Sequence, residues 1–190
     1  MYRALAHLAL ISETDLDNER ALVRLWDAYP IRVVLDSEAG GAQKIFAGDL
    51  DLTDKLSSSA VTAVVSTVAA HALVREAMVR EQRRIAGEAP VVMAGRDIGT
   101  VVLPDAPHKI FLTASVDARV DRRGAEMEAA GVDVSARRLR EEIEERDRLD
   151  QSRVTSPLRA APDAILIDST QMTAEEVANR IVSIVQDQPS

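Results

Sequence analysis

Apolar residues recur at helical spacing in three stretches of the first half of the chain. The stretches cover residues 1–11, 19–29 and 58–84, where apolar positions three and four residues apart line one face of a helix. The second helix is predicted to end at Pro30, because proline lacks the amide hydrogen that a helix interior needs. The third stretch is predicted to be helical with a break near His71.

Between the second and third helical stretches the pattern favours a β-hairpin. Residues 31–35 and 43–46 are short apolar-rich runs, and two adjacent glycines lie in the segment 37–41 between them. Glycine adopts the left-handed backbone conformations that tight hairpin turns need. We expect two strands joined across this turn, followed by a polar connection over 48–54.

Three short apolar runs from residue 91 onward alternate with helical patterns. The runs cover residues 91–94, 109–114 and 164–168. Each is typical of a strand buried on both faces in a parallel sheet. The helices are predicted over residues 118–130, 137–153 and 173–185. Thr173 and Glu176 form a capping box at the start of the last helix. Strands that alternate with helices predict an α/β fold with a parallel sheet.

The composition limits the classes of function. A length of 190 residues fits one domain, and 46% hydrophobic residues suffice for a core. A net charge of -8 and only 3% aromatic residues argue against a nucleic-acid-binding protein. The chain has no cysteine, no apolar run of membrane-spanning length and no signal-peptide pattern at its start, so we expect a cytoplasmic protein.

Polar residues interrupt the apolar patterns at two places. Gly95, Arg96 and Asp97 follow the run over 91–94, at the strand end where ligands of α/β sheets bind. They are candidates for a site, or they form a turn in which the two charges only neutralise neighbours. Ser66 and Arg75 lie within the third helical stretch, where they point to a site or are simply exposed.

The predicted helix over 137–153 is rich in charge. Most of its acidic and basic residues form pairs four residues apart, typical of a salt-bridged surface helix, and each pair contributes only about 0.3–0.5 kcal/mol. Arg146, Asp150 and Arg153 differ, because spacings of four and three place them on one face. Two cations that flank one acid can hold a ribose and a phosphate together.

Two long segments carry a resemblance to a known family. They read VVMAGRDIGTVVLPDAPHKIFLTAS from Val91 and EEIEERDRLDQSRVTSPLRAAPDAILIDST from Glu141. The chain resembles bacterial cytidylate kinases, a branch of the P-loop nucleoside monophosphate kinases, in register from Met1 almost to the C-terminus. The resemblance implies one α/β domain over 1–190 with a P-loop kinase-like parallel sheet core. It also implies a monophosphate-binding insert over about 36–75 and an arginine-bearing helical lid over about 117–150.

The same resemblance implies an activity and its partners. The family transfers the γ-phosphoryl group of ATP to CMP or dCMP with Mg²⁺, by positioning and charge neutralisation and without a covalent intermediate. We therefore expect CMP or dCMP and ATP as ligands, a monomer, and neither a nucleic-acid nor a membrane partner.

By position, the resemblance assigns residues of this chain to the two nucleotides. The family's base-binding set corresponds to Ser66, Arg75 and Asp97, and its ribose contacts correspond to Tyr2, Arg146 and Asp150. Its phosphate clamp corresponds to Arg3, Arg96 and Arg153. Its ATP-binding lid arginines correspond to Arg119, Arg122 and Arg123. Arg96, Arg146 and Arg153 are the candidate catalytic residues, and no residue is assigned to a metal. We expect the substrate-binding set to gather at one cleft.

The base-binding set suits cytosine. The 4-amino group of cytosine donates and fits the carboxylate of Asp97, while N3 and O2 accept and fit a guanidinium. Uracil would place an acceptor opposite the carboxylate, which also accepts, and two acceptors that face each other without a donor are costly when buried.

The sequence departs from the family in three places. The family opens with a strand, a phosphate loop of the type G-x-x-x-x-G-K-[ST], a helix and a second strand. No glycine here is followed by lysine, so this pattern is missing, and residues 1–3 resemble the segment after it. Ala94 stands where the family usually has an acid, and Leu56-Ser57 replaces a common Ile-Arg pair.

These departures leave three explanations open: an internal start, a shortened chain, or an inactive paralogue. We expect the 190 residues alone to have negligible kinase activity. The first alternative function is a CMP-binding remnant or regulatory paralogue without catalysis. The second is an arginine-rich helical module that binds RNA, which the acidic net charge disfavours.

Overall fold

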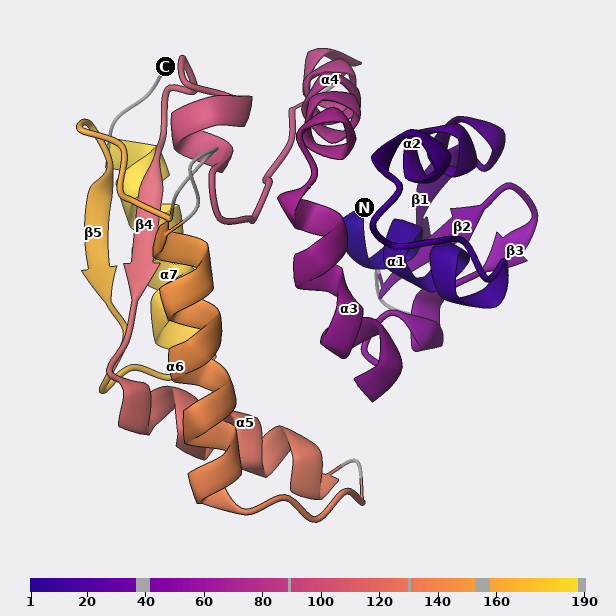
Figure 1. Cartoon of the computed structure of the whole chain (residues 1–190). Helices are drawn as coiled ribbons and strands as arrows, with labels where there is room; N and C mark the ends of the chain where they lie inside the picture. Colours follow the sequence, from indigo (N-terminus) through magenta and orange to yellow (C-terminus); the bar gives the residue numbers. More distant parts are fainter. Residues whose placement is uncertain (37–41, 89, 130, 153–157, 188–190) are drawn as a thin grey trace. The chain divides into compact units, whose positions relative to one another are not determined.

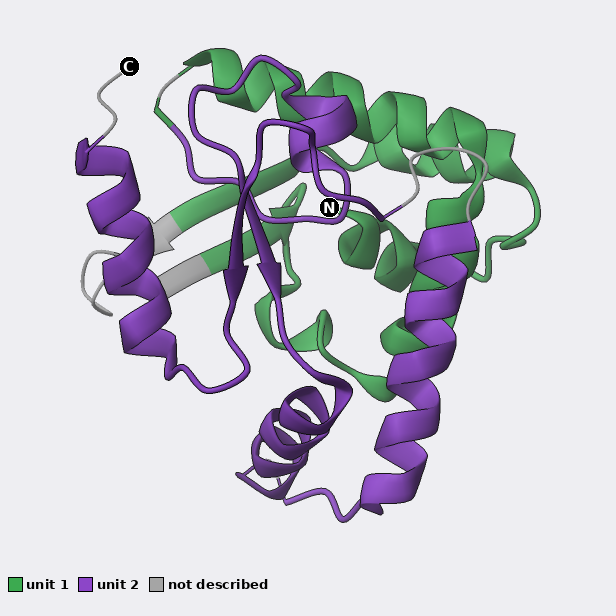
Figure 2. Ribbon diagram, turned by 90° about the vertical axis from the view of Figure 1, so that its left-hand side faces the viewer, with its two compact units in different colours: residues 1–90 green, residues 91–190 purple. Residues whose placement is uncertain are grey.

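The computed structural model describes residues 1–36, 42–88, 90–129, 131–152 and 158–187. The chain forms two compact units, residues 1–90 (unit 1) and 91–190 (unit 2), which Figure 2 distinguishes by colour. Helices and strands occur in both units, as labelled in Figure 1. The α/β class predicted from the sequence is confirmed.

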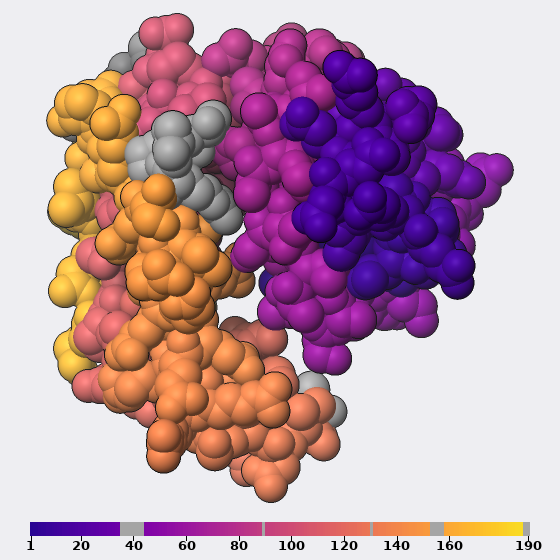
Figure 3. Space-filling view, viewed as in Figure 1, coloured from indigo at the N-terminus to yellow at the C-terminus, as the bar shows by residue number. Residues whose placement is uncertain are grey.

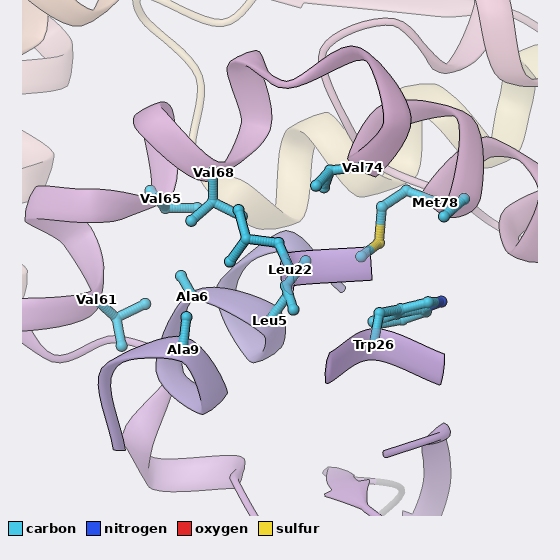
Figure 4. Close-up of a cluster of buried hydrophobic side chains, with 11 residues drawn as sticks. Leu5, Ala6, Ala9, Leu22, Trp26, Val61, Val65, Val68, Val74 and Met78 are labelled. Carbon is cyan, nitrogen blue, oxygen red and sulfur yellow. The ribbon is translucent and has the colours of Figure 1, made fainter. Parts of the chain in front are cut away.

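Four α-helices and an antiparallel sheet are the main elements of the described part of unit 1. The helices are α1 (Tyr2–Ile11), α2 (Glu19–Ala28), α3 (Ser59–Ala70) and α4 (Ala72–Glu88). Apolar side chains from all four meet in a buried cluster that includes Leu5, Leu22, Val68 and Met78 (Figure 4). Burial of each such side chain contributes about 1.5–3 kcal/mol, so this cluster fixes where the helices lie in unit 1.

The predicted hairpin of unit 1 is confirmed for its strands. β1 (Ile31–Asp36) and β2 (Ala42–Ala47) pair antiparallel, and the predicted turn over 37–41 lies outside the described residues. The predicted polar connection over 48–54 was incomplete, because it contains the short strand β3 (Leu50–Asp51) and the start of a 3-10 helix over Thr53–Lys55. The Thr53 hydroxyl accepts from the Ile45 amide at 3.0 Å, a contact that local hydrophobicity does not reveal.

The predicted break in the long helical stretch is confirmed at His71. α3 ends there, α4 begins at Ala72, and the two helix axes are bent by 96°. Among the described residues no single helix is long and apolar enough to span a membrane, and only this bent pair passes that test when its two helices are joined.

Among its described residues unit 2 contains a parallel strand pair, three α-helices and a short π-helix over Ile98–Val102. The strands and α-helices are β4 (Ile110–Thr113), α5 (Val116–Ala129), α6 (Ala136–Ser152), β5 (Ile165–Asp168) and α7 (Ala174–Asp187). β4 and β5 pair in parallel, as the alternating pattern predicts, and α5 packs against α6 (Figures 1 and 2). The capping box of α7 is confirmed, because the Glu176 amide donates to the Thr173 hydroxyl at 3.2 Å and the Thr173 amide donates to the Glu176 carboxylate at 2.7 Å.

The prediction of a buried strand over 91–94 was wrong. These residues form no strand, and Val92 is 98% exposed. A strand exists only where a second strand supplies its hydrogen-bond partners, and the described strands β4 and β5 pair with each other rather than with this segment. Burial on both faces was also wrong for β4 and β5, because Leu112 and Leu166 are exposed.

Candidate functional site

In unit 2, residues 95–97 form a turn that leads into a short π-helix, which begins after Asp97 and ends at Val102. The Asp97 carbonyl accepts from the amides of Val101 and Val102 at 2.9 and 3.2 Å, and the Asp97 side chain is buried. Gly95 allows a close approach, since a Cβ there would lie 2.9 Å from the Ile98 side chain. The turn thus fixes a buried carboxylate beside the exposed residue Arg96.

Asp150 of α6 holds two predicted site arginines. Its carboxylate Oδ2 lies 3.1 Å from Nε of Arg96 and 4.0 Å from Nε of Arg146. The Asp150 side chain is only 2% exposed, whereas both arginine side chains are 41% exposed. The predicted association of Arg146 with Asp150 on one helical face is confirmed, and Arg96 joins it from the turn before the π-helix.

Asp147, which no sequence pattern singled out, holds a third arginine. Arg119 of α5 donates two hydrogen bonds to the two oxygens of this carboxylate, at 2.9 and 2.6 Å. The hydrogen bond from Arg119 lowers the pKa of Asp147, and the charges of Arg96 and Arg146 act in the same direction. Asp147 precedes Asp150 by one helical turn, so the spacing alone could have placed both acids on the same face of the helix.

Unit 2 therefore carries a cluster of three arginines on two acids, which we call the α6 cluster. Its members are Arg96, Arg119, Arg146, Asp147 and Asp150. A planar guanidinium is suited to bind phosphate oxygens in pairs, and the two carboxylates hold these arginines in place. The rest of the exposed face of α6, orange in Figure 3, carries charged residues such as Arg137 and Glu141.

The two other predicted lid arginines make different contacts. Arg122 donates to the Ser169 hydroxyl at 3.2 Å, to the Met172 carbonyl at 3.1 Å and to the Ser169 carbonyl, so it ties α5 to the segment after β5. Among the described residues, Arg123 pairs locally, with Glu126 three residues along the same helix at 2.9 Å. Neither residue joins the α6 cluster.

Unit 1 brings two of its four predicted site residues together. The guanidinium of Arg75 lies over the ring of Tyr2, 5.8 Å from its centre, and Arg75 is only 5% exposed. Arg3 is held elsewhere, donating to the Leu56 carbonyl at 2.7 Å and to the Thr62 hydroxyl at 3.1 Å. Ser66 is half-buried on α3.

Arg153 lies outside the described residues, so its predicted place beside Asp150 stays a prediction. The predicted gathering of the residues of both units around one nucleotide also stays a prediction. Within the described parts of the chain, no group of three or more histidine, aspartate or glutamate residues is arranged to hold a metal ion.

A cavity in unit 2 has neither Asp97 nor the α6 cluster in its lining, although Gly99 and Thr100 of the π-helix after Asp97 contribute to it. Its lining includes Thr100, Lys109 and Asp163, and the last two form an ion pair at 2.6 Å. Lys109 and Asp163 precede β4 and β5, so the cavity lies at the amino ends of the strands. Ligands of parallel sheets bind at the opposite, carboxyl ends.

We expect Arg122→Ala to lower the free energy of unfolding by about 1–2 kcal/mol, because it removes three hydrogen bonds from a charged donor at a partly exposed position. Arg123→Ala, the matched control, should change it by less than about 0.5 kcal/mol. Urea unfolding followed by circular dichroism measures both. Equal losses would contradict the anchoring role of Arg122.

The chain is similar to known proteins over nearly its full length. The sequence model of the family described as cytidylate kinase matches residues 1–187. A protein named cytidylate kinase from Geobacillus thermodenitrificans (strain NG80-2) is 48% identical over 187 residues, which cover 98% of this chain and 82% of the relative. Cytidylate kinases of Geobacillus kaustophilus (strain HTA426) and Listeria monocytogenes serotype 4b (strain CLIP80459) are 49% and 45% identical, covering 98% of this chain and 82% and 81% of their own lengths.

Proposed function

The chain belongs to the cytidylate kinase family, and from this premise we propose that its residues serve the transfer of a phosphoryl group from ATP to CMP or dCMP. The observation that carries the proposal is the α6 cluster. A buried acid between two arginines is a suitable arrangement for a ribose and its phosphate, and a second acid one helical turn away holds a third arginine, Arg119 of α5. The family resemblance assigns Asp150 and Arg146 to the ribose and Arg96 to the phosphate.

In the proposed reaction a phosphate oxygen of CMP attacks the γ-phosphorus of ATP. One new P–O bond forms, the bond to the β,γ-bridging oxygen breaks, and ADP leaves with that electron pair. The attacking oxygen is already ionised, so no general base is needed. The arginines contribute by position and by neutralising charge on the transferred group, with Arg96, Arg146 and Arg153 in this role.

Asp97, Arg75 and Ser66 form the proposed recognition set for the base. The buried carboxylate of Asp97 accepts from the 4-amino group of cytosine, and Arg75 donates to its N3 and O2. Burial of Asp97 and Arg75 supports this role, because a hydrogen-bond mismatch with uracil is costly where water cannot compensate. Tyr2 and Arg3 complete the set on the ribose and phosphate.

We propose that the donor is ATP bound to Mg²⁺, with residues 36–75 as the monophosphate-binding insert and residues 117–150 as the lid. Arg119, Arg122 and Arg123 are the lid candidates for the ATP phosphates. In the part of the chain that the structure describes, Arg123 is held by one partly exposed ion pair, which exchanges partners at little cost, whereas Arg122 would have to leave three acceptors. We further propose a cytoplasmic monomer that acts without nucleic acid or membrane.

Binding of nucleotides to the 190-residue chain tests the acceptor site. We expect titration calorimetry to detect CMP with one site per chain and to detect UMP only weakly. Arg75→Ala should weaken CMP by about 10- to 100-fold, as expected for the loss of a buried charged donor. Arg80→Ala, a change of the same kind on α4, is the matched control and should leave the affinity within about twofold. Equal affinity for CMP and UMP would contradict the proposal.

A second candidate is a CMP-binding protein without turnover. The sequence favours it in one respect, because Ala94 stands where the family usually has an acid and Ser57 where it commonly has an arginine. We expect residues 1–190 by themselves to bind CMP but to give negligible ADP in a coupled assay with MgATP. Normal turnover would eliminate this candidate. No CMP binding would eliminate both.

A further inference from the structure

The start of α4 is held by the connection between α1 and α2. At the 96° bend between α3 and α4, the His71 ring nitrogen Nε2 lies 2.7 Å from the Leu16 carbonyl oxygen. A carbonyl oxygen can only accept, so Nε2 carries the hydrogen of this bond. The ring thereby joins the helix bend to the 12–18 connection.

Glu19, the first residue of α2, makes a second link to the same turn. Its carboxylate accepts from the Leu73 amide at 3.2 Å, one of the first amides of α4 that no helical carbonyl can satisfy. A negative charge at this helix end is also favoured by the helix dipole. Two polar side chains, His71 at the bend and Glu19 on α2, therefore set the position of the first turn of α4.

Arg75 lies in that turn. Its amide donates to the His71 carbonyl at 3.0 Å, and its guanidinium donates to the Ala69 carbonyl at 3.3 Å while lying over the Tyr2 ring. A buried guanidinium has few alternative positions, so its direction follows the backbone of the turn. A shift of α4 at its start would move Arg75 relative to Tyr2.

We propose that His71 and Glu19 are positioning residues for Arg75, and that they set the preference for cytosine over uracil. This inference rests on the proposed function, in which Arg75 contacts the base. Cytosine N3 accepts from a guanidinium, whereas uracil N3 carries a hydrogen and cannot. Discrimination at N3 therefore depends on where the Arg75 donors lie, and a displacement of about 1 Å is enough to weaken it strongly.

The test compares His71→Phe and Glu19→Ala with matched controls. His71→Phe keeps a ring but removes the donor to Leu16, and His7→Phe makes the same change on α1. Glu19→Ala removes the acceptor for Leu73, and Glu175→Ala removes a first-turn acid of another helix, α7. The readout is the ratio of the dissociation constants for UMP and CMP in each folded variant, with folding checked by circular dichroism.

We expect each positioning variant to reduce this ratio about 5- to 10-fold, and the controls to leave it within about twofold. The same changes made in an Arg75→Ala background should leave the ratio unchanged, because the residue through which they act is absent. A general loss of stability would weaken CMP and UMP alike and would not produce this pattern. Glu19→Ala keeps the test decisive if His71→Phe does not fold.

Two negative results have different meanings. If Arg75→Ala reduces the ratio but neither positioning variant does, the inference is wrong and the proposed function stands. If Arg75→Ala itself leaves the ratio unchanged, the assignment of Arg75 to the base is wrong, and the proposed function loses this part.

Discussion

Asp97→Asn should weaken CMP binding by about 100-fold or more and bring the affinity for UMP close to that for CMP. The side chains have the same size, so the change replaces one carboxylate oxygen by a donor at a buried position. The 4-amino group of cytosine then faces either a donor or a weaker, neutral acceptor. The carbonyl O4 of uracil gains a donor. Sites that recognise a substrate by buried hydrogen bonds reject mismatched analogues by about 10⁴- to 10⁵-fold, so a 100-fold loss is a conservative expectation.

Asp105→Asn is the matched control for this change. Asp105 is an exposed acid in the same unit, so the variant loses the same charge without altering a buried group. Titration of CMP and UMP into both variants gives the two affinities directly. Equal weakening of CMP and UMP by Asp97→Asn would show a structural effect only, and an unchanged CMP affinity would remove Asp97 from the site.

The elements that the sequence predicts well are those decided by near neighbours. The capping box of α7 needs only Thr173 and Glu176, which are three residues apart, and the structure contains both of its hydrogen bonds. Arg146 and Asp150 are likewise one turn apart on α6, so helical geometry alone brings them together. Such contacts are properties of a short window of sequence.

Contacts between distant residues were not predictable in this way. Nothing in the sequence relates Arg119 to Asp147, which are 28 positions apart and meet only because α5 packs against α6. The strand predicted over 91–94 failed for a related reason, since apolar residues make a strand only where another strand pairs with them. The role of Arg122 depends on backbone carbonyls after β5, which no residue pattern reports.

Asp150→Ala should have the largest effect on stability of any change in the α6 cluster. The carboxylate is buried between Arg96 and Arg146, and its loss leaves two guanidinium groups close together without the negative charge that offsets their repulsion. Removal of one partner from a fully buried ion pair costs about 3–5 kcal/mol. Because both arginines are partly exposed and screened by water, we expect about 2–3 kcal/mol from urea unfolding.

Two further variants turn this expectation into a graded series across α6. Asp147→Ala breaks the partly exposed ion pair with Arg119 and should lower the free energy of unfolding by about 1 kcal/mol. Glu141→Ala breaks an exposed ion pair with Arg137 and should lower it by less than about 0.5 kcal/mol. Asp150→Ala should also weaken CMP more than inorganic phosphate, because the proposed ribose contact is lost while the arginines remain. If Asp150→Ala proves as mild as Glu141→Ala, the acid does not organise these arginines. If CMP and phosphate are weakened equally, Asp150 has no separate contact with the ribose.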